Sequence, residues 1–476
     1  MFSKRLVVFA IAIVLTASLL TIVLQQKCSQ RREAAHVRRE FGRPNIIYIC
    51  SDDLGYGDLG CYGQKMIKTP HLDRMAAEGS RFTDFYAGSA VCAPSRCSLL
   101  TGFHSGHAFI KPRGKQRMRD EGGTPPRDLP LRSEEITVAE VLKDKGYSAA
   151  AIGKWHLGEL DTTGSPINQG FDYFFGPPER PPEDFYYPGA VLRSRLGKQE
   201  LTPVPEDAYI EDLLTDDALS FVERERDHPF FLYLAYFTPH APHSIRHLYP
   251  GYEDEPWSKD DKAFASMITH LDNNVGRLFD LLGRLDLDGN TVVFFSSDNG
   301  PEEPNFFNSA GPLKGIKRTL YEGGIRVPLL VRWPGVIAPG SVVTEPFAGW
   351  DFLKTAADLG GATVGWGDGV SFLPTLSGKE QHLSRPLYWE FQIKNDLGLV
   401  QAVRLGKWKG IRMTSPKSYR AEKKMFELYD LSSDVGEAHD VADQHPDIVR
   451  QISDIMSQEH ADSAARSGAN AETSSH

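Results

Sequence analysis

The segment NIIYICSDD (residues 45–53) decides the fold class of this chain. Its apolar run, Ile46 to Cys50, is unbroken, which is typical of a strand buried on both faces of a parallel sheet. Four later runs have the same character: SAAAI (148–152), FFLYLAYF (230–237), TVVFFSS (291–297) and VPLLVRW (327–333). Helical patterns lie between them, at 137–146 and 263–285. We therefore predict an α/β fold with a large, mostly parallel or mixed sheet sandwiched by helices.

The chain changes character after residue 375. Segments 385–391, 400–413 and 424–432 alternate polar and apolar residues, as strands of an antiparallel sheet do. A helical pattern follows at 447–459, and the last residues are too poor in apolar side chains to fold. The predicted units are a catalytic α/β domain (44–375), a smaller C-terminal subdomain with an antiparallel sheet and a helix (376–460), and a disordered tail (461–476).

The N-terminus predicts export. Lys4 and Arg5 precede an uncharged run, Leu6–Leu24, which as a helix would be about 28 Å long, close to the thickness of the bilayer core. We expect a signal anchor or signal peptide over 1–27 and a polar tether over 28–43. The rest of the chain would be periplasmic or extracellular, held at the membrane if the segment is retained. The absence of any Asn-x-Ser/Thr sequon favours a bacterial source.

The amino-acid composition excludes few classes of protein. The 476 residues include 41% hydrophobic and 24% charged residues, as in ordinary soluble domains, and the net charge of −10 does not indicate nucleic-acid binding. Five cysteines form no disulfide framework for a domain of this size, so at least one thiol needs another explanation.

Polar residues follow each of the first four predicted strands. Asp52 and Asp53 follow the first, and the others are followed by Lys154 and His156, by His240 and His243, and by Asp298 and Asn299. Each pair alone also fits a turn or a structural role. Because ligands of open α/β sheets bind beyond the carboxyl ends of the strands, we expect these side chains to share one site.

The residue types at this edge indicate a metal and an anion. Three carboxylates and an amide oxygen suit Ca²⁺ or Mg²⁺, whereas Zn²⁺ would recruit more histidine or thiolate. The cationic candidates around them are Arg96, Lys154, His156, His240 and Lys317. A divalent cation surrounded by positive side chains suits a tetrahedral oxyanion such as sulfate or phosphate.

The segment CAPSRCSLLTG (92–102) resembles the signature of the type I sulfatases, C-x-P-S-R-x-x-L-x-T-G. Five further segments are similar to the same family in the same order: SDDLGYGDLGCYG (51–63), GKWHLG (153–158), TPHAPH (238–243), SSDNG (296–300) and LKGIKRTLYEGGIRVP (313–328). The resemblance spans roughly residues 44–460. It implies an alkaline-phosphatase-like fold and hydrolysis of a sulfate ester.

The resemblance also implies roles for individual residues. A maturation enzyme would oxidise Cys92 to formylglycine (3-oxoalanine), and Ca²⁺, rather than Mg²⁺, would be bound by Asp52, Asp53, Cys92, Asp298 and Asn299. Arg96 would stabilise the hydrated aldehyde. Lys154, His240 and Lys317 would bind sulfate, and His240 or Lys317 would protonate the leaving alcohol.

The implied chemistry needs two hydroxyls on residue 92. One attacks sulfur, with Asp298 as proton acceptor, and the ester oxygen leaves as alcohol. The other, deprotonated by His156, expels inorganic sulfate and restores the aldehyde. Serine or cysteine has no second hydroxyl. Cys97, five residues further on, is predicted to be a buried structural thiol.

Three segments leave alternatives open. Phe103 stands where many family members have arginine, and His104 and His107 after it would either line the pocket or support the structure. The basic residues Lys111, Arg113, Lys115, Arg117 and Arg119 form either a solvated loop or a contact for a sulfated polysaccharide. The aromatic segments 172–176 and 184–189 either pack in the core or stack on sugar rings.

Two other functions compete with a sulfatase acting on a sulfated carbohydrate or aryl sulfate. A phosphatase or phosphodiesterase of the same superfamily would share the fold, but would carry threonine or serine as nucleophile and two metals. A chain with unmodified Cys92 would be a membrane-tethered binder of sulfated glycans.

Overall fold

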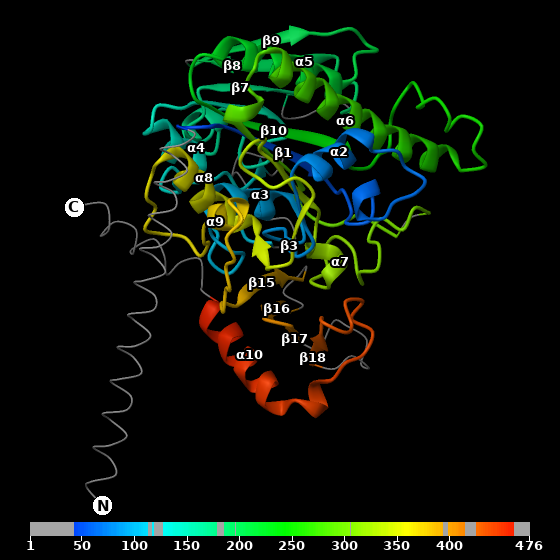
Figure 1. The fold of residues 1–476 in the computed structure, drawn as a ribbon, viewed down its shortest axis with the longest axis vertical. Coiled ribbons are helices and arrows are strands. Elements are labelled where there is room, and N and C mark those ends of the chain that lie inside the picture. Colours follow the sequence, from blue (N-terminus) through cyan, green and yellow to red (C-terminus); the bar gives the residue numbers. More distant parts are fainter. Residues whose placement is uncertain are drawn as a thin grey trace, which may run out of the picture.

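Five parallel strands form the centre of a ten-stranded sheet (Figure 1). In spatial order they are β11 (Thr291–Ser297), β1 (Asn45–Asp52), β10 (Phe230–Pro239), β6 (Ser148–Gly153) and β7 (Tyr173–Gly176). The computed structural model describes residues 42–112, 117–118, 127–178, 185–195, 197–304, 306–393, 398–414 and 425–460.

Strands of mixed direction extend the sheet on both sides. Next to β11 lie β12 (Leu329–Arg332), β2 (Ser80–Phe82) and β13 (Ser341–Val343), and next to β7 lie β8 (Ala190–Arg195) and β9 (Lys198–Pro203). The predicted strand at 327–333 is β12, and it runs antiparallel to β11. The prediction of a large mixed sheet is confirmed. Two short pairs lie apart: β3 (Phe85–Tyr86) with β14 (Phe347–Ala348), and β4 (Arg117–Met118) with β5 (Arg127–Asp128).

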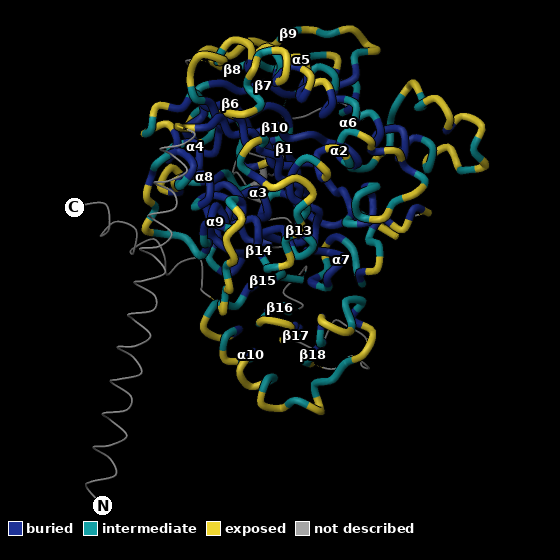
Figure 2. Tube along the Cα trace, in the orientation of Figure 1, coloured by how far each residue is buried: buried dark blue, intermediate teal, exposed yellow. Residues whose placement is uncertain are grey.

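Helices cover both faces of the sheet because residues of the central strands alternate between two cores. Ile47 and Ile49 of β1 pack in the core of α2 (Pro70–Glu78), α5 (Ile210–Glu225) and α6 (Lys259–Arg284). Ile46 and Tyr48 pack in the core of α3 (Cys92–Thr101), α4 (Val138–Lys143), α8 (Phe352–Gly360) and α9 (Leu373–Leu376). Figure 2 shows β1 and β10 buried between these layers.

The C-terminal part forms a smaller antiparallel sheet at one end of the molecule (Figure 1). Its strands, in order, are β15 (Leu387–Gln392), β16 (Leu399–Leu405), β17 (Trp408–Met413) and β18 (Phe426–Asp430). Helix α10 (Pro446–Glu459) packs against it through Ile452 and Met456. This confirms the predicted small sheet and helix.

A buried ionic cluster links the C-terminal sheet to a short helix that precedes it in the chain. The ammonium of Lys409 on β17 lies 2.8 Å from Glu322 of α7 (Glu322–Ile325) and 2.9 Å from Glu437. All three side chains are fully buried. Lys409 thus bridges the two carboxylates, and Arg326 pairs with Glu322 as well, at 3.1 Å.

The predictions for residues 1–27, 28–41 and 461–476 lie outside the described residues. Within the part of the chain that the structure describes, no helix has the length and apolar character needed to cross a bilayer.

Candidate active site

Four strands deliver polar residues to one edge of the sheet. Strands β1, β6, β10 and β11 are parallel, so their carboxyl ends lie on the same side. Asp52 ends β1, Lys154 follows β6, His240 follows β10 and Asp298 follows β11. The structure brings these side chains together, as the positions after the apolar runs predict.

An oxygen-rich group forms the centre of the site. Asp52, Asp53, Cys92 and Asp298 are buried, and each offers one potential ligand atom within 4.8 Å of the others. Asp53 has a left-handed backbone, with φ of 64°, a conformation that aspartate tolerates better than most residues. This turn brings the Asp53 carboxylate to the group.

Asn299 completes the set. Its Nδ2 donates to Asp53 Oδ1 at 2.6 Å, which fixes the orientation of the amide. Its Oδ1 is buried and has no hydrogen-bond partner among the described residues. An acceptor left in this state costs about 1–3 kcal/mol. A bound cation would satisfy this oxygen, so the donor set fits Ca²⁺ or Mg²⁺.

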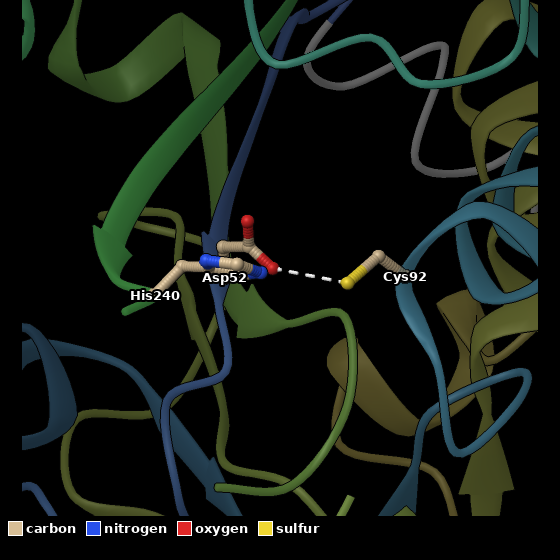
Figure 3. A group of neighbouring side chains, drawn as sticks. All are labelled: Asp52, Cys92 and His240. Carbon is tan, nitrogen blue, oxygen red and sulfur yellow. Dashed lines mark hydrogen bonds between the residues drawn. The ribbon is translucent and has the colours of Figure 1, made fainter. Parts of the chain in front are cut away.

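Cys92 is the first residue of α3 and is 5% exposed. Its Sγ donates to Asp52 Oδ1 at 3.3 Å, and a ring nitrogen of His240 lies within 4.8 Å of the sulfur and of an Asp52 carboxylate oxygen (Figure 3). Burial, and then the charges of Asp298 and Asp52, raise the pKa of the thiol well above its usual value. Because the thiolate is the reactive form of cysteine, the encoded side chain is a poor nucleophile here.

Arg96 holds Asp298 in place from one turn further along α3. Its Nε and Nη2 lie 2.9 and 2.7 Å from Asp298 Oδ2. Its Nη1 donates to the carbonyl of Lys154 at 2.9 Å and to the Tyr233 hydroxyl at 3.2 Å. The guanidinium is fully buried and permanently charged, so it fixes the ends of β6 and β11 and the middle of β10 relative to the helix.

Charges shift the two central aspartates in opposite directions. Burial works to raise the pKa of Asp52, but Lys154, which forms an ion pair with it, and then His240 and Arg96 hold it well below the usual range. Burial and the charge of Asp52 raise the pKa of Asp53 to about 8. Carboxylates that repel each other in this way are typical of a site for a divalent cation.

Lys317 and His240 lie on the Asp53 side of the group. Lys317 Nζ is 2.6 Å from Asp53 Oδ2 and 2.6 Å from Glu302 Oε2. His240 Nε2 is 3.6 Å from Asp53 Oδ2, and its Nδ1 lies 2.6 Å from the carbonyl of Ala241. Because that carbonyl can only accept, Nδ1 carries the proton and Nε2 faces the site. Burial lowers the pKa of His240.

A cavity of about 390 Å³ opens beside these residues. Lys154, His156, Glu159 and His240 form its polar wall, and the other lining side chains are mostly apolar, including Trp155, Phe174, Phe185 and Phe237. Of the two aromatic segments, therefore, Phe174 and Phe185 face the cavity, whereas Tyr173 and Tyr186 are buried in the core. His156 is exposed and, like Asp53, has a left-handed backbone, with φ of 62°.

His104 and His107 have a structural position. Their rings stack with centroids 4.1 Å apart, between Asp368 and Glu459 at the end of α10. The amide of Gly106 donates to His104 Nδ1, so Nε2 carries the proton and donates to Glu459 at 3.1 Å. Because both ring nitrogens of His104 are engaged in hydrogen bonds, the arrangement suits a hydrogen-bonded clamp better than a metal site. Of the two alternatives, the structure therefore favours the structural role, and neither histidine is among the residues that line the cavity of about 390 Å³.

Two further predictions meet different outcomes. Cys97 is fully buried in the core around α3, which confirms its prediction as a buried thiol.

The prediction for Lys111, in a basic loop that is either solvated or in contact with a polyanion, is wrong. Its side chain is buried and lies 3.1 Å from Glu390 on β15, a partner 279 residues away that no local charge pattern reveals. The side chains of Arg113, Lys115, Arg117 and Arg119 lie outside the described residues.

Sequence reasoning missed Glu302 and Tyr233. Glu302 follows the SSDNG segment by two residues, and its closeness to that motif is the signal that could have drawn attention to it. Tyr233 lies within an apolar strand that also contains Tyr236, and a hydroxyl in such a run is the corresponding signal for a buried polar contact, here with Arg96.

Comparison with known proteins decides the family. A sequence profile described as Sulfatase matches residues 44–362, about two thirds of the chain, and one described as N-sulphoglucosamine sulphohydrolase, C-terminal, matches residues 316–462. The chain belongs to the sulfatase family. Arylsulfatase A of Homo sapiens is 34% identical over 464 residues, covering 87% of each chain. N-acetylgalactosamine-6-O-sulfatase of Bacteroides thetaiotaomicron is 30% identical over 519 residues, covering 91% of this chain and 96% of that one.

Solved structures of sulfatases share the fold. Ps i-CgsB in complex with k-i-k-neocarrahexaose has a TM-score of 0.73 at 28% identity, covering 87% of this chain and 92% of that one. BT4656 in complex with D-glucosamine-2-N,6-O-disulfate has a TM-score of 0.65 at 22% identity, covering 87% and 97%. The expected alkaline-phosphatase-like architecture of this sulfatase is thus confirmed, and the protein is a sulfuric ester hydrolase.

Proposed function

We propose that this sulfatase hydrolyses a sulfate ester to an alcohol and inorganic sulfate, using formylglycine made from Cys92 and a Ca²⁺ ion. One observation carries the proposal: Cys92 starts α3 inside the group of three buried aspartates, with its Sγ 3.3 Å from Asp52. The amino-terminal amides of a helix favour an anion at that position.

The oxygens of the site support a bound divalent cation. Asp52, Asp53, Asp298 and the orphaned Oδ1 of Asn299 would hold it, together with residue 92. Ca²⁺ suits this all-oxygen set, and Mg²⁺ is the second choice. Bound there, the cation would supply positive charge to the sulfate oxygens.

Each side chain around this group has a position that supports a separate role in the reaction. Formylglycine, when hydrated, supplies two hydroxyls on one carbon, one for attack and one for release of sulfate. Arg96 orients Asp298, the proton acceptor for the attacking hydroxyl. Lys154, His240 and Lys317 bind sulfate, and His156, exposed on the cavity wall, takes the proton of the second hydroxyl.

Lys317 favours a sulfatase over a two-metal phosphatase. Asp53, His240 and Glu302 lie close enough together to hold a second cation. The ammonium of Lys317 lies between Asp53 and Glu302, at 2.6 Å from each. A fixed positive side chain there takes the place in which a second metal would bind.

The substrate we propose is a sulfated carbohydrate, with aryl sulfates as the second class. Relatives of this chain are named as N-acetylgalactosamine-6-O-sulfatase and arylsulfatase A. A cavity of about 390 Å³ with Phe174 and Phe185 on its wall suits a single ring of either kind. We propose no role for nucleic acid.

We also propose where the protein is located and how the chain is divided into domains. Residues 1–27 would direct export to the periplasm or the cell exterior, as a signal anchor or signal peptide, with 28–43 as tether. The catalytic domain would be 44–375, the C-terminal subdomain 376–460 and the tail 461–476. The matched ranges 44–362 and 316–462 support the outer limits of the two folded parts.

The peptide that contains residue 92 tests the modification. Trypsin releases FTDFYAGSAVCAPSR (82–96), and mass spectrometry of protein from the native host should show the loss of sulfur and two hydrogens and the gain of one oxygen. Protein from a host that lacks the maturation enzyme is the control. An unmodified cysteine in fully active protein would overturn the proposal and favour another nucleophile.

Removal of the cation should abolish activity and lower stability. Treatment with a chelator exposes three neighbouring carboxylates to one another, so we expect a fall in melting temperature of several degrees and at least a hundredfold lower hydrolysis of 4-nitrophenyl sulfate. Addition of Ca²⁺ should restore both. Asn299→Ala should weaken the rescue, because it removes the amide oxygen. Full activity in the chelated protein would contradict the assignment.

A further inference from the structure

Glu302 links the proposed site to its surroundings through two cations. One oxygen, Oε2, lies 2.6 Å from Lys317 Nζ, and the other, Oε1, accepts from Arg318 Nη1 at 2.7 Å. The lysine side chain is 4% exposed, whereas the arginine side chain is 55% exposed. A surface arginine thus holds the carboxylate that holds the buried lysine.

The backbone around Lys317 is fixed to both halves of the site. Its amide donates to the carbonyl of Pro301 at 2.9 Å, next to Glu302 in sequence. The amide of Arg318 donates to the carbonyl of Ala90 at 2.8 Å, two residues before Cys92. Arg318 has a φ of 71°, which is unfavourable for a long side chain and is maintained only where the surroundings require it.

Lys317 has a second anionic partner, Asp53, but that carboxylate belongs to the group that would hold the cation. A carboxylate that binds a divalent ion has less negative charge to offer an ammonium. Glu302 contributes no atom to the four-residue group of Asp52, Asp53, Cys92 and Asp298. Its attraction for Lys317 is therefore independent of whether that group is occupied.

We propose that Glu302 is a positioning residue that holds the ammonium of Lys317 toward the leaving oxygen of the sulfate ester. The inference rests on the proposed function, in which Lys317 or His240 protonates that oxygen, and it assigns the task to Lys317. As the bond between sulfur and the ester oxygen breaks, the oxygen keeps the electron pair and takes a proton from Lys317 Nζ. The amine then recovers a proton from water.

Protonation of the leaving oxygen matters most when the leaving group is poor. The ratio of kcat/KM for a good and a poor leaving group therefore reports on the proton donor, and a merely structural role of Glu302 would leave this ratio unchanged. The test compares 4-nitrophenyl sulfate, whose leaving group is stable as an anion, with phenyl sulfate, whose leaving group is not. For Glu302→Gln we expect kcat/KM on phenyl sulfate to fall about tenfold or more, with a loss under about threefold on 4-nitrophenyl sulfate. Glutamine can accept from only one of the two cations, because its amide nitrogen is a donor.

Matched variants distinguish a positioning role of Glu302 from a general loss of structure. Glu303→Gln removes the same charge from the next, exposed residue and should match the wild type on both substrates. Arg318→Asn keeps a residue that tolerates the left-handed backbone and should give a smaller loss of the same kind as Glu302→Gln. Melting temperatures of all variants show whether each is folded.

Lys317→Met serves as the reference. Because Lys317 also binds sulfate, activity should fall on both substrates, and the loss on phenyl sulfate should be the larger, at about a hundredfold. Selective loss in Lys317→Met but wild-type ratios in Glu302→Gln would overturn the inference and leave the proposed function intact. An equal loss on both substrates in a folded Glu302→Gln protein would also overturn it. Selective loss in His240→Ala and none in Lys317→Met would reject Lys317 as the donor, and the inference with it, without touching the formylglycine proposal.

Discussion

Cys92→Ser is expected to carry out one round of sulfate transfer and then stop. Its single hydroxyl lies at the start of α3, 40 residues from Asp52 in the chain but beside it in the fold. The hydroxyl has the geometry to attack sulfur but leaves no second hydroxyl to expel sulfate. Turnover of 4-nitrophenyl sulfate should fall about a thousandfold or more, as when other enzymes lose their nucleophile.

The measurement is a burst experiment together with peptide mass analysis. We expect no more than one equivalent of nitrophenol per protein, and sulfate retained on the 82–96 peptide. Cys97→Ser makes the same chemical change in the core below the helix, where the thiol is fully buried. That control should turn over substrate while losing some stability. Steady turnover by Cys92→Ser would mean that the second hydroxyl is unnecessary and that the proposed chemistry is wrong.

Lys409→Met is expected to cause the largest loss of stability of any single change considered. The substitution leaves Glu322 and Glu437 facing each other in a fully buried site, without the ammonium that lies 2.8 and 2.9 Å from them. Removing one partner of a buried ionic group costs about 3–5 kcal/mol. Arg326, 3.1 Å from Glu322, offsets part of the charge on that side only.

Lys407→Met is the matched control, two residues earlier in the chain. Lys407 pairs with Asp430 at 2.5 Å, but half of its side chain is exposed, and such surface pairs contribute about 0–1 kcal/mol. Thermal melts of the two variants, at fixed scan rate and Ca²⁺ concentration, should show a fall of several degrees for Lys409→Met and little change for Lys407→Met. Equal melting temperatures would mean that the buried cluster adds no net stability.

The sheet and the cluster of acidic residues follow from local sequence properties. The predicted run 291–297 coincides with β11, and 230–237 falls within β10, because unbroken apolar runs in an α/β pattern leave few alternatives. The rule that ligands bind at the carboxyl ends of parallel strands then brings Asp52 and Asp298 together. The direction of β12 depends on its connection and neighbours, which its own residues do not encode.

Local sequence patterns do not predict the role of a residue whose partner is distant in the chain. Lys111 is indistinguishable in sequence from a solvated basic residue, because Glu390 reaches it only through the docking of the C-terminal sheet. Glu302 belongs to no periodic pattern, and its importance comes from a lysine 15 residues further on. Local patterns therefore predict which residues meet at a sheet edge more readily than which partner orients each of them.

The meeting of four strand ends has a consequence for biosynthesis. Asp53 contacts Asn299 and Lys317, which are 246 and 264 residues later in the chain. A chain still emerging from the ribosome therefore contains the first carboxylates and Cys92 long before their partners exist. The complete site can therefore form only once two thirds of the protein has been made.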